Sequence, residues 1–299
     1  MNASLMFLEI LVALAGLGIL IGDLWTPANQ KKNLGYGAAA FLGILFFFSF
    51  NMEEGPVRYA FGGMYILDDL ALFFKRVFLM SGAVVMVMAV RFSPKIRRGE
   101  SEFYVLILFA LAGMMVASSA FDFSLLFVAL ELITITFYIL ASYLRSETTS
   151  LEAGVKYLIL GALSSAVLVY GIALLFGSTS ALSFVEITET LSQGSVTLAS
   201  NPLAVAGAIM IFAGLAFKLA VFPFQFWAPD VYQGAPTPVT AFLAVGSKFA
   251  GMVLMMRVLF QALPSITINW SAFLTTLAIF TILYGNLAAI PQKDRKSVV

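Results

Sequence analysis

Long runs of apolar residues, separated by short polar segments, repeat along the whole chain. A run of about 20 apolar residues is long enough to cross a bilayer as a helix. Indole rings favour the headgroup layer, and all three tryptophans, Trp25, Trp227 and Trp270, fall near the ends of such runs. We therefore expect an all-α polytopic membrane protein of about nine helices, at roughly residues 4–25, 34–50, 65–90, 103–120, 123–144, 154–176, 203–227, 238–260 and 268–290.

The composition supports this class and excludes several kinds of site. Of the 299 residues, 61% are hydrophobic and 11% are charged, whereas soluble domains are about one quarter charged. The net charge of +1 gives no basic surface for nucleic acid. The chain has no cysteine and no histidine, which excludes disulfides, cysteine-ligated zinc, iron–sulfur clusters and histidine-based catalysis. We expect neither a cofactor nor a metal in this chain.

Basic residues gather on one side of the predicted membrane. With the sides taken alternately, one side carries Lys31, Lys32, Arg91, Lys95, Arg97, Arg98, Arg145, Lys293, Arg295 and Lys296. The other side carries only Arg58 and, near a helix end, Arg257. Because positive residues stay in the cytoplasm, we expect the N-terminus outside and the C-terminus in the cytoplasm, with the protein in the cell inner (plasma) membrane. The stretch 177–201, which has no Lys or Arg, fits the outside.

A few charged residues fall inside the predicted helices. They are Glu131, Lys156, Lys218 and Lys248, in four consecutive helices. Each costs at least ~2.5–3.5 kcal/mol at the bilayer centre. One interpretation is salt bridges that hold helices together, and the other is a path for protons. Lys156 lies close enough to a helix end for its side chain to reach the surface. Four other charges near helix ends are expected at the interface: Glu9, Asp23, Lys75 and Arg76.

The fifth predicted helix carries a polar stripe. Glu131, Thr134, Tyr138 and Ser142 are spaced three, four and four residues apart, so they share one helical face. A polar stripe in a membrane helix faces protein or water rather than lipid. Hydrogen bonding between helices would explain it; because the stripe includes a carboxylate, we favour a hydrated path.

The seventh predicted helix contains both a lysine and a helix breaker, in AFKLAVFPFQFW at residues 216–227. Pro223 has no N–H and crowds the carbonyl of Leu219, one residue after Lys218. Backbone groups freed at membrane depth persist only beside protein or water. Lys218, Pro223 and Gln225 therefore indicate a hydrated cavity. Lys248 follows near mid-membrane in the next helix, beside the small residues Gly246, Ser247 and Gly251.

These groups suggest a proton relay. A lysine in a low-dielectric site binds its proton less tightly, and a nearby carboxylate has the opposite effect. Glu131 close to Lys218 would keep the lysine charged, and moving Glu131 away would release the proton. We expect Glu131, Lys218, Lys248 and Lys156 to carry this relay, with the helix break at Pro223 and Gln225 acting as its gate.

The same residues carry a family resemblance. GLAFKLAVFPFQFWAPDVYQGAPTPVTAFLAVGSK, LELITITFYILASYLRS, EAGVKYLILGALSSAVLVYGIALLFG and EFYVLILFALAGMMVAS resemble the subunit N family of NADH–quinone oxidoreductase, respiratory complex I. The resemblance implies an antiporter-like subunit of the membrane arm, built from two inverted five-helix units. Glu131, Lys156, Lys218 and Lys248 match the family's charged residues of helices five to eight. NADH, flavin (FMN), iron–sulfur clusters and quinone are then expected in other subunits.

The resemblance also predicts an organisation and two departures from the family pattern. Three N-terminal helices would occupy residues 1–101, a five-helix antiporter-like unit 102–265, and a ninth helix with a tail 266–299. The family usually has histidine at the position of Gln225, and glutamine cannot take up a proton at ordinary pH. The family also continues for several helices beyond GNLAAI, whereas this chain ends at PQKDRKSVV, so we expect a C-terminally truncated form without the lysine of the twelfth helix.

The function expected from these features is proton translocation within complex I, coupled to quinone reduction elsewhere in the complex. The expected partners are the lipid bilayer and other membrane-arm subunits, both neighbouring antiporter-like subunits and small transmembrane ones. A subunit of a cation/proton antiporter or of a membrane-bound hydrogenase-type complex is the alternative. A non-conducting structural half-subunit is a third.

Overall fold

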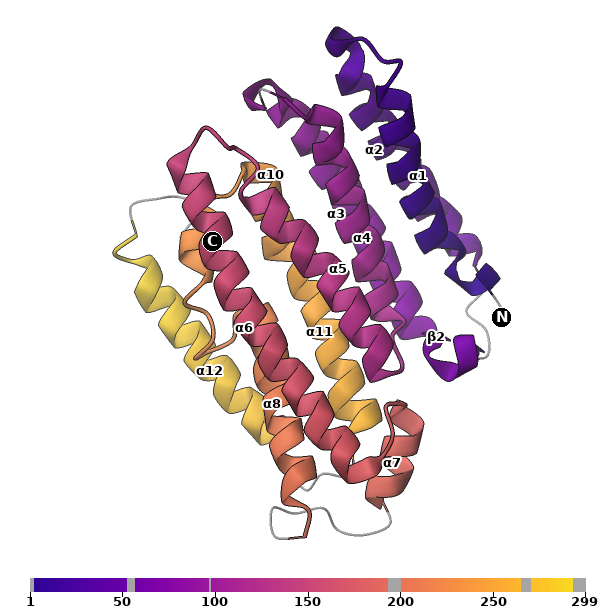
Figure 1. Cartoon of the computed structure of the whole chain (residues 1–299), viewed down its shortest axis with the longest axis vertical. Coiled ribbons are helices and arrows are strands. Elements are labelled where there is room, and N and C mark those ends of the chain that lie inside the picture. Colours follow the sequence, from indigo (N-terminus) through magenta and orange to yellow (C-terminus); the bar gives the residue numbers. More distant parts are fainter. Residues whose placement is uncertain (1–2, 53–56, 97, 193–199, 265–269, 293–299) are drawn as a thin grey trace.

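The computed structural model of the chain describes residues 3–292, apart from 53–56, 97, 193–199 and 265–269. Within these residues, nine helical segments are long and apolar enough to cross a membrane. They lie side by side along the longest axis of the molecule (Figure 1). The predicted all-α class and the predicted number of spans are confirmed.

Three helices form the N-terminal part of the bundle: α1 (Phe7–Asp23), α2 (Lys31–Phe48) and α3 (Asp69–Phe92). The third predicted helix, which began at residue 65, was placed too far upstream. The Asp68 carboxylate accepts a hydrogen bond from the Ala71 N–H at 2.9 Å, so Asp68 is the N-cap and the helix begins at the next residue. The charged residues Lys75 and Arg76 therefore lie within the helix rather than before it.

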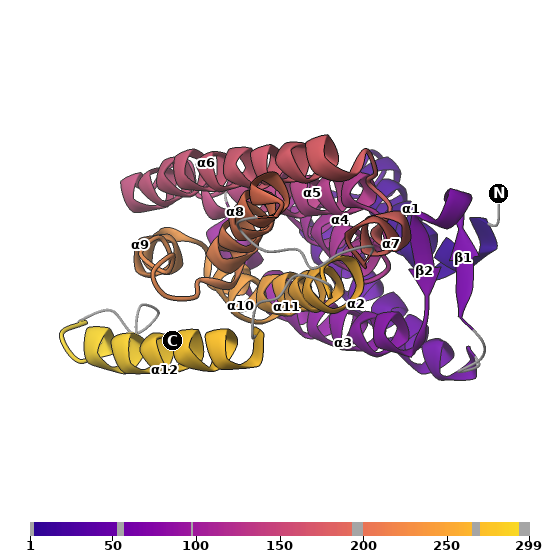
Figure 2. The ribbon, with the colours of Figure 1, turned by 90° about the horizontal axis from the view of Figure 1, so that it is seen from below.

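A small hairpin occupies the stretch before α3, where no strands were predicted. Its antiparallel strands are β1 (Arg58–Ala60) and β2 (Tyr65–Leu67), with Tyr59 paired to Ile66. The Ile66 N–H donates to the Ser119 carbonyl at 2.9 Å. This bond fixes the hairpin on the end of α4, at the edge of the molecule opposite α12 (Figure 2).

The centre of the bundle consists of α4 (Glu100–Ser118), α5 (Phe123–Ala141), α6 (Thr148–Thr179) and α8 (Pro202–Leu219). α4 is apolar and buried on nearly all sides, as expected for a helix surrounded by others. The stretch 177–201 contains one short helix that was not predicted, α7 (Phe184–Ser192). Its buried residues Phe184, Ile187 and Leu191 follow helical spacing and anchor it against the end of the bundle.

The remaining helices are α9 (Ala228–Gly234), α10 (Thr237–Phe242), α11 (Lys248–Arg257) and α12 (Trp270–Ala289). Two π-helical turns, Leu243–Ser247 and Val258–Ala262, join and extend α10 and α11 into one span, Thr237–Ala262. α12 lies at the edge of the molecule (Figure 2), and no residue within it is buried. The core therefore lies among α1 to α11.

α6 and α8 pack closely because glycines line their contact. A β-carbon on Gly207 would lie 2.8 Å from the Gly171 carbonyl oxygen, and one on Gly214 would lie 2.7 Å from the Leu168 β-carbon. Small residues let membrane helices approach at the backbone. This contact determines where the C-terminal end of α8, which carries Lys218, lies relative to α6.

Candidate functional site

The break in the seventh span begins before the proline. α8 ends at Leu219, and Ala220 adopts a left-handed conformation with φ 54°. The Val221 N–H returns to the Ala216 carbonyl at 3.0 Å, which closes the helix end in the manner of a Schellman motif. The predicted discontinuity is confirmed, but the seventh predicted helix, drawn to residue 227, ends eight residues earlier.

The carbonyl of Leu219, which the sequence predicted to be free, has a specific partner. Lys248 Nζ donates a hydrogen bond to it at 2.8 Å. The Phe217 carbonyl at this helix end accepts from Trp227 Nε1 at 2.9 Å as well as from the Ala220 N–H at 3.0 Å. Because side chains occupy both acceptors, the broken segment is held in a defined shape at membrane depth.

Lys248 connects this break to the eighth span. It is the first residue of α11, directly after the π-helical turn Leu243–Ser247, and such turns are frequent at functional sites. Its Nζ lies 5.1 Å from the centroid of the Trp227 ring, within the range of a cation–π contact. Lys248 also lines a cavity of about 390 Å³, together with Gln225, Tyr232 and residues of α12.

Lys218 is the most isolated cation of the site. Its side chain is in the last turn of α8 and is only 6% exposed. Among the described residues, Nζ has neither a hydrogen-bond partner nor an ion pair. The centroid of the Phe217 ring lies 6.0 Å from Nζ. Glu131 is the carboxylate whose charge acts on Lys218.

Hydrogen bonds through α6 link Glu131 of α5 to α8, the helix that carries Lys218. Ser165 Oγ donates to Glu131 Oε1 at 2.6 Å, and the adjacent Ser164 Oγ donates to the Gly214 carbonyl of α8 at 3.2 Å. Gly214 lies one turn before Lys218. Two neighbouring serines of α6 thus bind different helices, Ser165 the carboxylate of α5 and Ser164 the backbone of α8.

The polar stripe of α5 faces protein. The Tyr138 ring contacts the Tyr157 ring edge-on, with centroids 5.0 Å apart. Tyr157 in turn stacks on Trp227 at 4.9 Å, the ring that contacts Lys248. The bond between Glu131 and Ser165 is an interhelical hydrogen bond, one of the two explanations that the sequence offered for the stripe.

The other predicted residues lie elsewhere. Gln225 shares its cavity with Lys248 rather than with Lys218. Pro223 is exposed and lines an apolar groove of about 320 Å³ between α6 and α8. Lys156 lies at the surface: its side chain is 43% exposed and forms ion pairs with Glu152 at 2.7 Å and Asp230 at 2.6 Å. Its length allows it to reach the surface, the possibility noted from the sequence.

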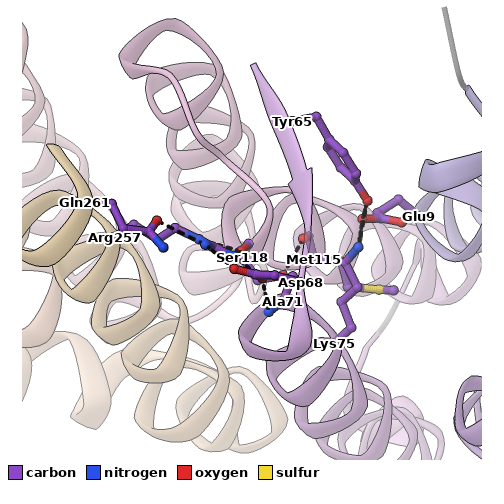
Figure 3. Close-up of polar contacts among 9 residues, drawn as sticks. All are labelled: Glu9, Tyr65, Asp68, Ala71, Lys75, Met115, Ser118, Arg257 and Gln261. Carbon is purple, nitrogen blue, oxygen red and sulfur yellow. Dashed lines mark hydrogen bonds and ion pairs between the residues drawn. The ribbon is translucent and has the colours of Figure 1, made fainter. Parts of the chain in front are cut away.

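A buried charged cluster, not predicted from the sequence, lies at the hairpin end of the bundle (Figure 3). Glu9 and Lys75, expected at the interface, form an ion pair at 2.8 Å and are 3% and 1% exposed. The Tyr65 hydroxyl donates to Glu9 Oε1 at 2.8 Å and accepts from Lys75 Nζ at 2.6 Å. Both charges stand within apolar runs, and this feature of the sequence could have indicated that they are buried.

A second ion pair adjoins this cluster. Arg257, expected near a helix end, is 0% exposed and binds Asp68 through two bonds of 2.7 Å. It also donates to the Ser118 carbonyl at 2.8 Å. Burial would raise the pKa of the Asp68 carboxyl, but the hydrogen bonds and charge of Arg257 hold that pKa below its ordinary value of 3.8. The pair ties α11 to the start of α3.

Comparisons with known proteins agree on one family. Residues 119–299 match the family model described as "NADH:quinone oxidoreductase/Mrp antiporter, TM". The chain is 39% identical over 298 residues to NADH-quinone oxidoreductase subunit N of Moorella thermoacetica, and 40% identical over 304 residues to that of Heliobacterium modesticaldum. All of the chain is covered in both comparisons, and 61% and 62% of the relatives.

A solved structure shows the same arrangement of helices. It is respiratory complex I from Thermus thermophilus with bound aureothin, in which one chain superposes with a TM-score of 0.76 at 30% identity. The superposition covers 97% of the present chain and 60% of the other. The chain thus spans about three fifths of the length of the proteins it matches, and the resemblance inferred from its motifs is confirmed.

Proposed function

Because the chain belongs to the NADH:quinone oxidoreductase/Mrp antiporter family of membrane subunits, we propose that it acts as a proton-translocating subunit of the N type in the membrane arm of an NADH–quinone oxidoreductase. The observation that carries this proposal is Lys218, a buried cation without a hydrogen-bond partner among the described residues, beside a broken helix. A buried unpaired charge is strongly destabilising, and intramembrane ionisable groups mark proton or ion paths.

The proposed relay uses the three charges near the break. Glu131, held by Ser165, stabilises a proton on Lys218 when the two approach, and its withdrawal releases that proton. Lys248, which is bonded to the Leu219 carbonyl, is the next acceptor. The cavity beside Lys248 and Gln225 would hold the water that connects them. Lys156 is the surface-exposed member of the relay, and Pro223 with Gln225 belongs to its gate.

The expected domains, partners and locations of the cofactors follow from the proposed identity as an N-type subunit. Residues 1–101 would form an N-terminal three-helix unit, 102–265 the antiporter-like unit, and 266–299 the ninth helix with its tail. The partners would be neighbouring membrane-arm subunits and the bilayer of the inner (plasma) membrane. NADH, FMN, iron–sulfur clusters and quinone would belong to other subunits, so this chain would contribute translocation but no redox site to the enzyme.

Purification of the native assembly tests membership of a quinone-reducing enzyme. A tagged form of the chain should bring down NADH-oxidising activity and the optical signals of iron–sulfur clusters. A subunit of a cation/proton antiporter, the alternative that the family description also includes, would purify with membrane subunits alone. That second result would contradict membership of a quinone-reducing enzyme but would not contradict the proposed proton relay.

A further inference from the structure

Residues of the α3–α4 and α5–α6 connections line one groove, and both connections lie at the upper end of the bundle in Figure 1. The volume of the groove is about 820 Å³. α4 forms the floor and packs against both α1 and α5, whose Leu20 and Ile139 line the two walls. None of the relay residues lines this groove.

Cations dominate the rim of the groove. Lys95, Arg98 and Arg145 line it and are exposed, and Glu102 is the one carboxylate among the described residues that line it. None of the three cations forms an ion pair with a described residue. Lys95 Nζ lies 5.4 Å from the centroid of the Phe92 ring. The rim therefore has an excess of positive charge that no described side chain neutralises.

The depth of the groove is apolar. Leu106 and Phe109 of α4 lie below the cations, between Leu20 and Ile139, which are 37% and 45% exposed. Tyr143, which lies between Ile139 and Arg145 in the chain, also lines the groove, and its hydroxyl donates to the Gly99 carbonyl at 2.6 Å. Burial and the nearby charge of Glu102 raise the pKa of Tyr143 to about 12, against the opposing charge of Arg145, so this hydroxyl remains a donor at neutral pH.

We propose that this groove binds one anionic phospholipid, with its phosphate at Arg98, Arg145 and Lys95 and its acyl chains on Leu106 and Phe109. The vertical order of charges, a tyrosine and apolar side chains matches the order of headgroup, interface and hydrocarbon in a leaflet. An acidic protein segment would match the rim but not the exposed apolar walls. A free anion would use the rim and leave the apolar depth unfilled.

Lipid retention by the whole purified chain tests this site. The chain is first incubated with equal amounts of phosphatidylglycerol and phosphatidylcholine and then washed in detergent. Native mass spectrometry should show one preferentially retained phosphatidylglycerol. The variant R98Q/R145Q should lower the ratio of retained phosphatidylglycerol to phosphatidylcholine by at least about fivefold. Each Lys or Arg near a membrane surface strengthens the binding of anionic lipid by about that factor. The matched control K32Q/R91Q removes two exposed cations that do not line the groove and should leave the ratio unchanged.

Two further measurements separate the possible ligands. Leu106→Trp should fill the floor and reduce retention of phosphatidylglycerol, whereas millimolar inorganic phosphate should not displace the lipid. Equal retention by wild type and R98Q/R145Q, or displacement by phosphate alone, would overturn the proposal. It would also be overturned if a crosslinker at Arg145→Cys in the native assembly captured a protein segment instead of lipid. Circular dichroism and thermal melting confirm that each variant is folded.

Discussion

At the residue scale, the site depends on how one carboxylate is held. Ser165 donates to Glu131 Oε1 at 2.6 Å, and hydrogen bonds to charged groups contribute about 1.5–3 kcal/mol. Ser165→Ala should therefore lower proton pumping per assembled complex, and Glu131→Gln should lower it further because no carboxylate remains. Proton uptake and complex abundance are measured on the same membranes.

Ser164 provides the control for that prediction. Its hydroxyl binds the Gly214 carbonyl rather than Glu131, so Ser164→Ala should change pumping per assembled complex little. If Glu131→Gln instead reduces assembly and pumping by the same factor, the charges hold helices together and the relay interpretation fails.

The ion pair of Asp68 and Arg257 gives a prediction about pH. Since Arg257 lowers the pKa of Asp68 below 3.8, the pair's contribution is fully present above that pH and is lost as the pH falls through the lowered value. Asp68→Asn should remove about 3 kcal/mol of stability at neutral pH, and the difference from wild type should shrink in acid. Thermal unfolding in detergent between neutral pH and pH 3 measures this difference.

A neighbouring residue distinguishes this pair from general acid unfolding. Asp69 is exposed and forms no ion pair with a described residue. Asp69→Asn should therefore shift the unfolding temperature little at any pH. A loss as large as that of Asp68→Asn would contradict a specific role for the buried pair.

At the element scale, the contact between α6 and α8 sets the position of Lys218. A β-carbon on Gly207 would lie 2.8 Å from the Gly171 carbonyl oxygen, whereas one on Gly177 would meet nothing within 4 Å. Gly207→Ala should cost about 1–3 kcal/mol through overpacking. Gly177→Ala, in the same pair of helices, should be neutral or stabilising because alanine favours helix. Equal effects on thermal unfolding would show that the close contact is not maintained.

The membrane helices could be predicted from the sequence, because a membrane span needs about 20 apolar residues whatever its neighbours are. The predicted helix ends were less accurate. Asp68 has the side chain of an N-cap, but Tyr65 to Leu67 are as apolar as the helix that follows, so hydropathy alone extended the third helix too far. The short helix α7 has only nine residues, too few to stand out in a loop.

Which charges come together depends on contacts between distant segments. The break at Lys218 and Pro223 was predicted from local chemistry, but the partner of the Leu219 carbonyl, Lys248, lies 29 residues away. Glu9 and Lys75 stood in apolar runs, yet only the packing of α1 against the hairpin and α3 shows them paired. Hydropathy predicts the position of such a residue along a membrane helix, but it does not predict which side chain on another helix contacts it.

At the scale of the whole molecule, the basic connections lie together. Those between α1 and α2, α3 and α4, and α5 and α6 are at one end, and the hairpin and α7 are at the other (Figure 1). The absence of native cysteine allows the orientation to be measured with single introduced thiols. An impermeant reagent outside intact cells should label Tyr59→Cys but not Ser146→Cys, because positive loops remain inside. Inverted vesicles should give the reverse, and labelling of Ser146→Cys in intact cells would contradict the predicted orientation.

The central claim is that Lys218 carries protons. The most direct test is the number of protons translocated per NADH oxidised by the purified native assembly in sealed liposomes, with Lys218→Ala compared with the exposed control Lys32→Ala. We predict that Lys218→Ala assembles normally and loses the share of proton translocation that this subunit carries, while Lys32→Ala matches wild type. A wild-type ratio in a fully assembled Lys218→Ala complex would contradict the account.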